Sequence, residues 1–388
     1  MSNMPTLSIT NVGQIKTASI KFGDLTVFVG QQATGKSIAL QLLKLAIDAG
    51  QVQREMRRYG LDWSGQLSDF LNSYFGEGMN AIWKETSGVR WQGNDLDLQQ
   101  MAKRKRKAKE EMLFYIPAQR VLTLRDGWPR PFTDYSPGDP FAVREFSEQL
   151  RVLVDKELGS SSLFPQARRL KREFRELLER DVFSEYALKI DRVRSQKRLV
   201  LGTDTDGGNL PYMVWSAGQR EFVPLLLGFY WLMPPTKVSR RGHIEWVVLE
   251  ELEVGLHPRA ISVVLLLVFE LVVRGYRVCL STHSSQVLDA LWAMKHLSEN
   301  GANAKAFLEI FGAPKTPPML RLAKGMMSKI RTVYYFDKES GTVHDISALE
   351  PGAEESGQSG WGGLSEFSGR ASGAVAQAIA NAIPKAEP

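Results

Sequence analysis

The chain has 388 residues, of which 43% are hydrophobic, and a formal net charge of +6. This composition allows a sizeable core with two lobes, and the single cysteine, Cys279, excludes an internal disulfide and favours a reducing cytoplasm. No signal peptide opens the chain, and the longest apolar run, 260–273, is too short for a bilayer and contains Glu270, so no membrane partner is expected. The positive charge permits contact with nucleic acid without establishing it.

The N-terminal segment predicts three short strands, a glycine-rich loop and a helix. Residues 7–10 and 15–22 alternate apolar and polar side chains, whereas 25–29 is wholly apolar, as in a buried central strand. The motif Gly-x-x-x-x-Gly-Lys-Ser follows at 30–37, and an apolar-periodic helix covers 37–49. A strand before this motif and a helix after it are typical of a phosphate-binding P-loop.

The P-loop predicts that ATP binds here with Mg²⁺. Gly30 and Gly35 permit a tight turn that points backbone N–H groups inward, and the helix N-terminus adds to the attraction for phosphate. Lys36 is expected to reach the β- and γ-phosphates, and the Ser37 hydroxyl is expected to bind Mg²⁺. The predicted nucleotide-binding residues of this loop are Gly30, Gln31, Gln32, Ala33, Thr34, Gly35, Lys36 and Ser37.

Three features follow the P-loop helix. Residues 63–100 mix aromatic side chains, glycines and short alternations, which favours a small β-rich subdomain or lid. The run 103–109 has six cations in seven residues, and it is either a solvated loop or a contact for a phosphate backbone. Residues 112–116 predict a strand, and Gln119 follows it where it could touch Mg²⁺ or the attacking water.

A charged, helix-prone segment lies between the two halves of the predicted sheet. Residues 128–140 are rich in Pro, Gly and Asp and predict a loop, and 141–195 predicts two or three amphipathic helices that form an inserted lobe. The charged face of this lobe is either solvated or a surface for DNA or a partner protein. Its basic residues are Arg168, Arg169, Lys171, Arg172 and Arg175.

A second anion-binding helix terminus is predicted near the middle of the chain. Ser216, Ala217 and Gly218 precede an apolar helix that ends near 232, and Gln219 stands three residues after Ser216, as in a capping box. One interpretation is a helix cap alone. The other is that this helix N-terminus binds the γ-phosphate of a nucleotide held by another subunit.

Acidic and histidine side chains follow two further apolar strands. The strand 244–249 ends in Glu250, which would bind the metal through water, and Glu251, which would polarise the attacking water. A solvated acidic turn is the alternative. His283 follows the strand 278–281 at the same expected edge of the sheet, where it could donate a hydrogen bond to the γ-phosphate.

The C-terminal part predicts a strand over 331–337 that forms a hairpin with 343–346, then a Gly/Ser/Glu-rich linker over 351–363 and an Ala-rich helix over 371–383. These patterns divide the chain into four parts. They are an N-terminal half of an ATPase head (1–140), an inserted helical lobe (141–200), a C-terminal half of the head (201–350) and a linker with a terminal helix (351–388).

The order of these motifs resembles the ABC-class ATPase heads of the SMC/RecF/OLD branch and their compact relatives called AAA-family ATPases. The matching motifs are Ser-Ala-Gly-Gln-Arg at 216–220, Leu-Glu-Glu at 249–251, Leu-His-Pro at 256–258 and Ser-Thr-His-Ser at 281–284. The resemblance implies an α/β P-loop NTPase fold with a mixed central sheet, an N-terminal antiparallel β subdomain and an inserted helical lobe.

In that family ATP lies between two heads. The resemblance therefore implies that Ser216 and Gly218 bind the γ-phosphate in trans, that His283 binds it in cis, and that Gln119 takes the Q-loop role. Three features depart from the family pattern. Glu250 stands where the wider class usually has Asp, no long coiled coil is present, and no acidic nuclease motif follows His283.

These observations favour an ATP-hydrolysing switch that associates with itself through an ATP sandwich and controls an effector, such as a nuclease or toxin, in anti-phage defence. The alternative is a RecF-like or SMC-like DNA-binding ATPase in repair or recombination. A transporter subunit is disfavoured by the signature words and the Leu-His-Pro turn. A scaffold that binds ATP without turnover is a further hypothesis.

Overall fold

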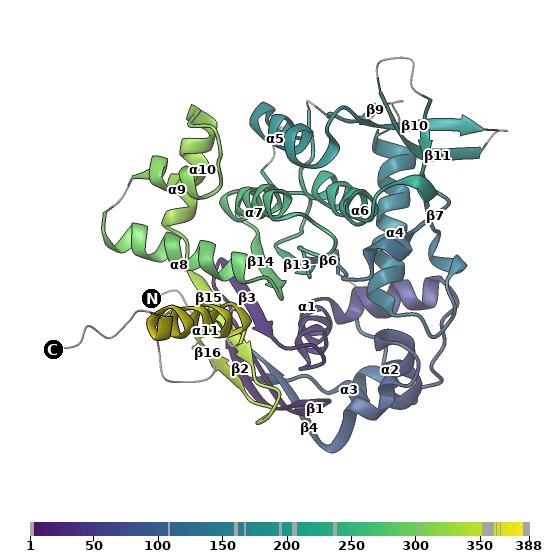
Figure 1. Ribbon diagram of the computed structural model, residues 1–388. Helices are drawn as coiled ribbons and strands as arrows, with labels where there is room; N and C mark the ends of the chain where they lie inside the picture. Colours follow the sequence, from purple (N-terminus) through teal and green to yellow (C-terminus); the bar gives the residue numbers. More distant parts are fainter. Residues whose placement is uncertain are drawn as a thin grey trace.

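A six-stranded sheet forms the centre of the computed structural model, which describes residues 4–107, 109–158, 162–166, 168–193, 196–203, 208–235, 239–301, 303–350, 361, 363–364 and 366–382 (Figure 1). The strand order is β16-β15-β3-β14-β13-β6, and all neighbours are parallel except the edge hairpin of β15 and β16. The predicted mixed sheet is confirmed. Its strands are β3 (Leu25–Gly30), β6 (Leu113–Ile116), β13 (Trp246–Glu250), β14 (Arg277–Ser281), β15 (Arg331–Phe336) and β16 (Val343–Asp345).

Helices cover both faces of this sheet. Val27 and Val29 of β3 belong to the core that includes α6 (Ala217–Leu232) and α7 (Pro258–Val273), whereas Phe28 belongs to the core with α1 (Lys36–Arg58). Every residue of β3 and β13 is buried, which explains their unbroken apolar sequences. The carboxyl ends of β3, β13 and β14 therefore open at one edge of a fully covered sheet, where ligands bind in this type of fold.

The N-terminal strands form a separate antiparallel sheet of order β2-β1-β4-β5. The prediction of a β-rich subdomain or lid over 63–100 is only partly correct. Strand β4 pairs with β1 and so extends the N-terminal sheet, and the rest is largely helical, because Phe70, Leu71, Tyr74 and Phe75 share one buried helical face. These elements are β1 (Thr6–Val12), β2 (Ile15–Lys21), β4 (Trp83–Trp91), β5 (Asn94–Asp95), α2 (Leu67–Phe75) and α3 (Leu98–Lys103).

The inserted lobe is less helical than predicted. Helices α4 (Phe141–Val152) and α5 (Arg172–Leu178) are present, but the hairpin of β10 (Ala187–Val193) and β11 (Gln196–Gly202) belongs to a four-stranded antiparallel sheet. Its other strands are β9 (Ser162–Phe164) and β12 (Leu210–Pro211). Strand β8 (Trp128–Pro129), at the start of the predicted loop, pairs with β7 (Leu124–Arg125) just before it.

In the C-terminal part the predicted hairpin forms strands β15 and β16 of the sheet, and three helices share its core: α8 (Ser285–Glu299), α9 (Ala304–Ile310) and α10 (Pro317–Met327). Helix α11 (Glu366–Ala382) follows, while the predicted linker lies outside the described residues except for Trp361 and Gly363. No described helix is long and apolar enough to cross a membrane. Short 3₁₀ or π turns occur at Met79–Ile82, Arg120–Thr123, Phe132–Asp134, Leu153–Leu158, Glu179–Phe183 and Tyr212–Val214.

Candidate nucleotide-binding site

The loop between β3 and α1 has a backbone shape that requires glycine at two positions. Gly30 and Gly35 have φ angles of 140° and 96°, and a Cβ atom on Gly30 would lie 2.5 Å from the Phe336 carbonyl oxygen. A Cβ atom on Gly35 would lie 2.7 Å from the Ile15 side chain. Only glycine fits these positions, so the loop can fold tightly between the strand and the first turn of α1.

The Lys36 side chain lies against this loop. Its ammonium group donates to the carbonyl oxygens of Gly30, at 2.9 Å, and Gln31, at 2.7 Å, and the residue is 5% exposed. Burial lowers the pKa of Lys36 from 10.5 to about 8, although Glu251, Glu253 and Glu250 oppose this shift. A phosphate group entering the cavity would offer this buried cation stronger acceptors than backbone carbonyls.

A cavity of about 290 Å³ opens over the P-loop. Glu251 and His283 line it together with the loop, so the structure brings together three segments that lie far apart in the sequence. Gln14 also lines the cavity, although nothing in its sequence context pointed to it. The lining residues are Gln14, Gln32, Ala33, Thr34, Gly35, Lys36, Ser37, Ile38, Glu251 and His283.

Glu250 lies behind this cavity at the end of β13 and is 3% exposed. Its Oε2 atom accepts a hydrogen bond from the Ala118 N–H at 3.1 Å, whereas its Oε1 atom is buried and has no partner among the described residues. Burial raises the pKa of Glu250, and the neighbouring Ser37 side chain opposes the shift. A buried carboxylate oxygen without a partner beside a hydroxyl group is a donor set that fits Mg²⁺.

Glu251 and His283 face each other across the cavity, with Glu251 Oε1 and His283 Nε2 3.7 Å apart. The neighbouring His283 side chain lowers the pKa of Glu251, so this carboxylate is ionised at neutral pH, as a general base must be. Glu251 has a positive φ of 45°, and its N–H donates to the Ser281 carbonyl at 3.0 Å. The turn after β13 thereby holds the carboxylate beside the end of β14.

Glu253 is a site residue that the sequence did not indicate. Its Oε1 atom accepts a hydrogen bond from the His283 backbone N–H, and its Oε2 atom is buried without a partner among the described residues. It also raises the pKa of Lys36 against the effect of burial. Glu253 therefore ties the loop after β14 to the acidic turn, and only the run of acidic residues after β13 could have suggested it.

Arg120, and not Gln119, connects the segment after β6 to the site. Arg120 is fully buried and donates to the carbonyl oxygens of Glu221, Glu250 and Glu251 at 3.2, 3.0 and 3.1 Å. Gln119 is exposed and is not among the residues that line the cavity, so its contact with Mg²⁺ or the attacking water stays a prediction. The turn after β6 directs Arg120 inward and leaves Gln119 facing solvent.

Ser216 to Gln219 form the predicted cap of α6. The Ser216 hydroxyl accepts from the Gln219 N–H at 3.2 Å, and the Gln219 side chain accepts from the Ser216 N–H at 3.0 Å. Ser216 and Ala217 are exposed, and none of these four residues lines the P-loop cavity. Gly218 packs closely on the turn between β13 and α7, where an added Cβ atom would lie 2.9 Å from the Gly255 carbonyl oxygen.

Arg120 joins this capped helix to the turn after β13. Its guanidinium group donates to the carbonyl oxygen of Glu221 on α6 and to the carbonyl oxygens of Glu250 and Glu251. Replacing Arg120 with lysine keeps the charge but removes the planar fork, so we expect turnover to fall about 10- to 100-fold while the Kd for ATP changes less than about threefold. Steady-state kinetics and ATP titration measure this split. Arg125→Lys, at a 63% exposed side chain, is the matched control.

Residues 133–289 match the family model described as "AAA domain, putative AbiEii toxin, Type IV TA system". This segment contains the capped helix, the acidic turn and His283, whereas the P-loop lies before it. No curated protein matches the chain.

Two solved structures to which the chain is similar are SMC heads. "Crystal structure of the SmcHead bound to the C-winged helix domain of ScpA" has a TM-score of 0.40 and 11% identity, and the match covers 88% of this chain and 96% of that one. "SMC head domain from Thermotoga maritima" has a TM-score of 0.34 and 12% identity, with 89% and 98% covered.

The parallel strands of the central sheet and the cavity that the P-loop shares with Glu251 and His283 define an α/β fold of the P-loop class. Membership of the SMC-like branch, which the order of the motifs favours, stays a prediction.

Proposed function

We propose that this chain is an ATP-hydrolysing switch whose heads associate around ATP and thereby control a partner effector in the cytoplasm. One observation carries the proposal. The P-loop cavity contains Lys36, Glu251 and His283, whereas Ser216 and Ala217, at the N-terminus of the capped helix, are exposed outside it. A second copy of the chain could place its own Ser216 against the phosphate, and this arrangement would complete the site.

Each residue of the cavity has a chemical task in this proposal. The loop N–H groups and Lys36 bind the triphosphate, and Ser37 and Glu250 hold Mg²⁺, which neutralises charge on the phosphate oxygens. Glu251 accepts the proton of the attacking water, and His283 donates a hydrogen bond to the γ-phosphate. When two heads close, fixed donors replace water around the reacting phosphate, which strengthens these interactions.

Exposed apolar side chains beside the capped helix support the association of two heads. Met213 and Val214 are 70% and 61% exposed, and Leu122 on the adjacent turn is 55% exposed. The two turns are in contact, because the Tyr212 hydroxyl donates to the Val121 carbonyl at 3.3 Å. An apolar surface next to Ser216 is where a second head would bury side chains on closing.

Replacing Met213 and Val214 with serine is expected to weaken this association at least tenfold and to leave ATP binding by each chain unchanged. Burying one such side chain contributes about 1.5–3 kcal/mol, and the isologous interface would lose the pair twice. Light scattering with Mg²⁺ and a non-hydrolysable ATP analogue measures the monomer–dimer equilibrium. Ile310→Ser, at a 40% exposed side chain on α9, is the matched control, and wild-type dimerisation of the double variant would contradict the proposal.

The proposed effector is a nuclease or toxin, and the proposed setting is anti-phage defence. Two observations support this proposal. The chain has a P-loop nucleotide-binding cavity, and the description of the matched family names a putative toxin of a toxin–antitoxin system. The test is co-expression with the product of the neighbouring gene. A toxicity that changes when Glu251 is replaced by glutamine would support control by this head, and an unchanged growth rate would oppose it.

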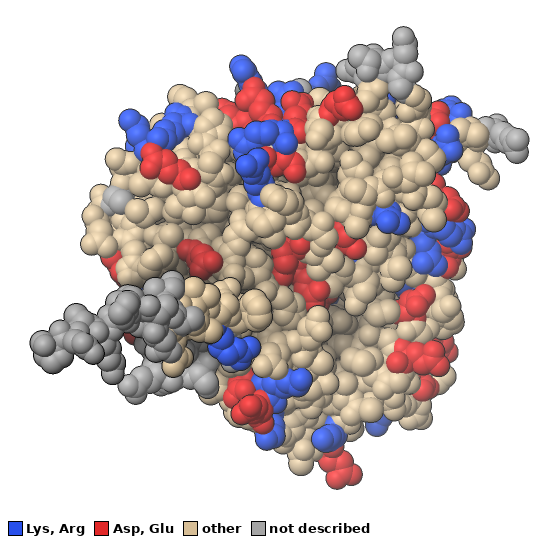
Figure 2. Space-filling model, viewed as in Figure 1, with Lys and Arg blue, Asp and Glu red and all other residues tan. Residues whose placement is uncertain are grey.

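A DNA-binding ATPase of RecF or SMC type is the second candidate. Lys103, Arg104, Lys105, Arg106, Lys107 and Lys109 are exposed and form no ion pair among the described residues. By contrast, Arg169, Lys171 and Arg172 of the inserted lobe each pair with a carboxylate. Figure 2 shows basic and acidic side chains interspersed over one face of the molecule. Adding a DNA duplex to the light-scattering assay at two salt concentrations distinguishes the candidates, since phosphate contacts weaken steeply with salt.

A further inference from the structure

Two hydrogen bonds join the acidic turn after β13 to the end of β14, and they run in opposite directions. The Glu251 N–H donates to the Ser281 carbonyl oxygen at 3.0 Å, whereas the His283 N–H donates to the Glu253 carboxylate. One bond therefore goes from the turn to the strand, and the other goes from the segment after the strand back to the turn. These two bonds tie together the segments that hold the proposed base and the proposed γ-phosphate donor.

The His283 N–H lies just beyond the last ladder bond of β14. The Thr282 N–H still donates to the Phe28 carbonyl oxygen of β3 at 3.0 Å, and the Ser284 N–H donates to the Thr282 hydroxyl at 3.0 Å. Between them, the His283 N–H has no acceptor among the described residues other than Glu253. A partly buried N–H group without an acceptor is unfavourable, so this carboxylate determines where the backbone of residue 283 lies.

Glu251 does not need Glu253 to keep its own position. Its N–H donates to Ser281, and its carbonyl oxygen accepts from the Arg120 guanidinium group at 3.1 Å. The Glu251 and His283 side chains are 3.7 Å apart, which is too long for a hydrogen bond that would fix the imidazole. Loss of the Glu253 acceptor would therefore displace His283 relative to a Glu251 that stays in place.

The Glu253 carboxylate could also act through its charge. Burial lowers the pKa of Lys36 and of Arg120, and Glu253 is among the carboxylates that oppose both shifts. Its Oε2 atom is buried without a partner among the described residues, so the bond to His283 uses Oε1 alone. A glutamine at 253 would keep this acceptor and lose the charge, whereas an aspartate would keep the charge and be one methylene group shorter. Reach and charge can therefore be separated at this position.

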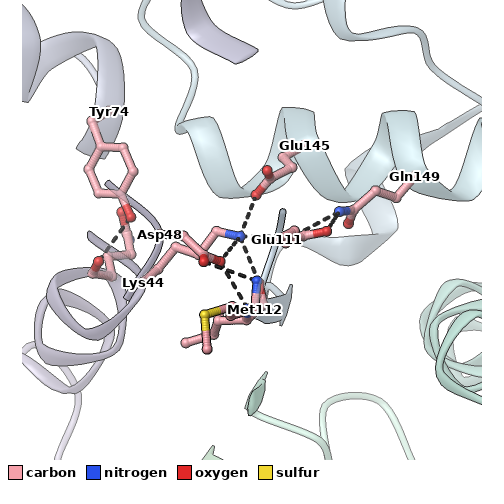
Figure 3. A network of polar contacts seen from close by, with 9 residues as sticks. Lys44, Asp48, Tyr74, Glu111, Met112, Glu145 and Gln149 are labelled. Atoms are coloured by element: carbon pink, nitrogen blue, oxygen red, sulfur yellow. Dashed lines mark hydrogen bonds and ion pairs between the residues drawn. The ribbon is translucent and has the colours of Figure 1, made fainter. Parts of the chain in front are cut away.

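A carboxylate that accepts backbone N–H groups from another segment also occurs away from the nucleotide cavity. Asp48 of α1 accepts from the Met112 and Leu113 N–H groups at 3.0 and 2.9 Å (Figure 3). These bonds hold α1 against the start of β6, and none of the three residues lines the nucleotide cavity. Glu253 differs because the residue that it holds, His283, does line that cavity.

We propose that Glu253 is a positioning residue for ATP hydrolysis, which holds the His283 imidazole at the γ-phosphate and beside the base Glu251. This role rests on the proposed function, because it requires that His283 donates to the γ-phosphate. A change at residue 253 reaches the reaction through the backbone of His283. Turnover should therefore depend on the reach of the side chain at 253 and not on its charge.

Two variants of the full chain separate reach from charge, and both are measured at pH 7 by phosphate release and by titration with ATP. Glu253→Asp is expected to lower turnover at least about tenfold, because a misplacement of about 1 Å can cost about a hundredfold in rate. Glu253→Gln should stay within about threefold of the wild type, and the Kd for ATP should change less than about threefold in both. Wild-type turnover in the aspartate variant, or a glutamine variant impaired at least as much, would overturn the proposal.

A double-mutant cycle tests whether the effect passes through His283. His283→Ala alone is expected to lower turnover about a hundredfold, as when one donor to a reacting oxygen is removed. Adding Glu253→Asp to this variant should lower turnover by less than about threefold more, and losses that multiply would overturn the proposal. The association of two heads is measured separately by mass, so a wild type that stays a single chain contradicts the proposed switch without changing how the cycle is interpreted.

Amide exchange detects the same contact without ATP or turnover. The chain has five histidines, so ¹⁵N-histidine labelling gives few backbone signals, and His283→Ala identifies the signal of residue 283. Its exchange should be at least about tenfold faster in Glu253→Asp than in Glu253→Gln or the wild type, and equal exchange in all three would overturn the proposal. Glu148→Asp is the matched control and should keep wild-type turnover, because Glu148 accepts the Phe132 N–H at 3.1 Å outside the nucleotide cavity.

Discussion

Replacing Lys36 with alanine is expected to raise the Kd for Mg²⁺-ATP by about a hundredfold or more. Hydrogen bonds to charged groups contribute about 1.5–3 kcal/mol each, and this ammonium group is proposed to contact two phosphates. Hydrogen bonds to the carbonyl oxygens of Gly30 and Gln31 hold the ammonium group at the cavity. On binding, the phosphate oxygens would replace these acceptors. Titration calorimetry with ATP measures the change.

Lys21→Ala is the matched control for this variant, because Lys21 is an exposed lysine at the end of β2, outside the cavity. Both variants should keep the circular dichroism spectrum of the wild type. An alanine variant at 36 that is folded and binds ATP with wild-type affinity would show that the triphosphate does not use the P-loop.

The same lysine predicts how ATP binding depends on pH. Burial lowers the pKa of Lys36 to about 8, so the nucleotide-free protein loses this positive charge as the pH rises through 8. Binding then requires the uptake of one proton, and the affinity should fall up to about tenfold per pH unit above 8 while remaining nearly constant just below it. Titrations between pH 7 and 9.5 test this, and the alanine variant should lack the dependence.

The site residues that were predicted from the sequence alone share one property. Each stands directly after an apolar strand, as Glu251 follows β13, His283 follows β14 and the P-loop follows β3. Parallel strands end at the same edge of a sheet, so local patterns were sufficient to place these side chains together without knowledge of the tertiary structure. Their chemical roles remain proposals, but their convergence on one cavity was predictable.

Arg120 was missed because its importance comes from partners that are distant in sequence. It contacts the carbonyl oxygens of Glu221 and Glu250, which are 101 and 130 residues away. Neither the strand before it nor the turn around it distinguishes Arg120 from its neighbour Gln119, whose polar amide looked more suitable for a metal or a water molecule. The turn after β6 directs Arg120 into the core and leaves Gln119 exposed, and the sequence does not predict this turn.

The inserted lobe was misjudged in its second half for a different reason. The helices predicted over 141–195 include residues 187–193, although Leu188 and Ile190 alternate with charged neighbours at a period of two. A period of two indicates a half-buried strand. The charge content of the whole segment obscured this short signal, and its pairing with Gln196–Gly202 was not visible from composition.

Replacing Glu251 with glutamine is expected to lower ATP turnover by about 10²- to 10⁴-fold and to retain ATP binding. The amide has the shape of the carboxylate but cannot accept a proton from water, and the backbone of residue 251 keeps its N–H bond to Ser281. Lys36 and the P-loop are unchanged, so the nucleotide should bind and remain bound. Because hydrolysis is what reopens the proposed sandwich, the variant should accumulate as an oligomer in the presence of Mg²⁺-ATP.

Light scattering with and without Mg²⁺-ATP, combined with phosphate release, measures both effects on one sample. Glu245→Gln makes the same chemical change at an exposed position just before β13, so it should retain wild-type turnover and mass. A Glu251→Gln variant with wild-type turnover would show that this carboxylate is not the base. If turnover is lost and the mass stays that of one chain, Glu251 acts in hydrolysis within a single head, and the exposed Ser216 must serve another purpose.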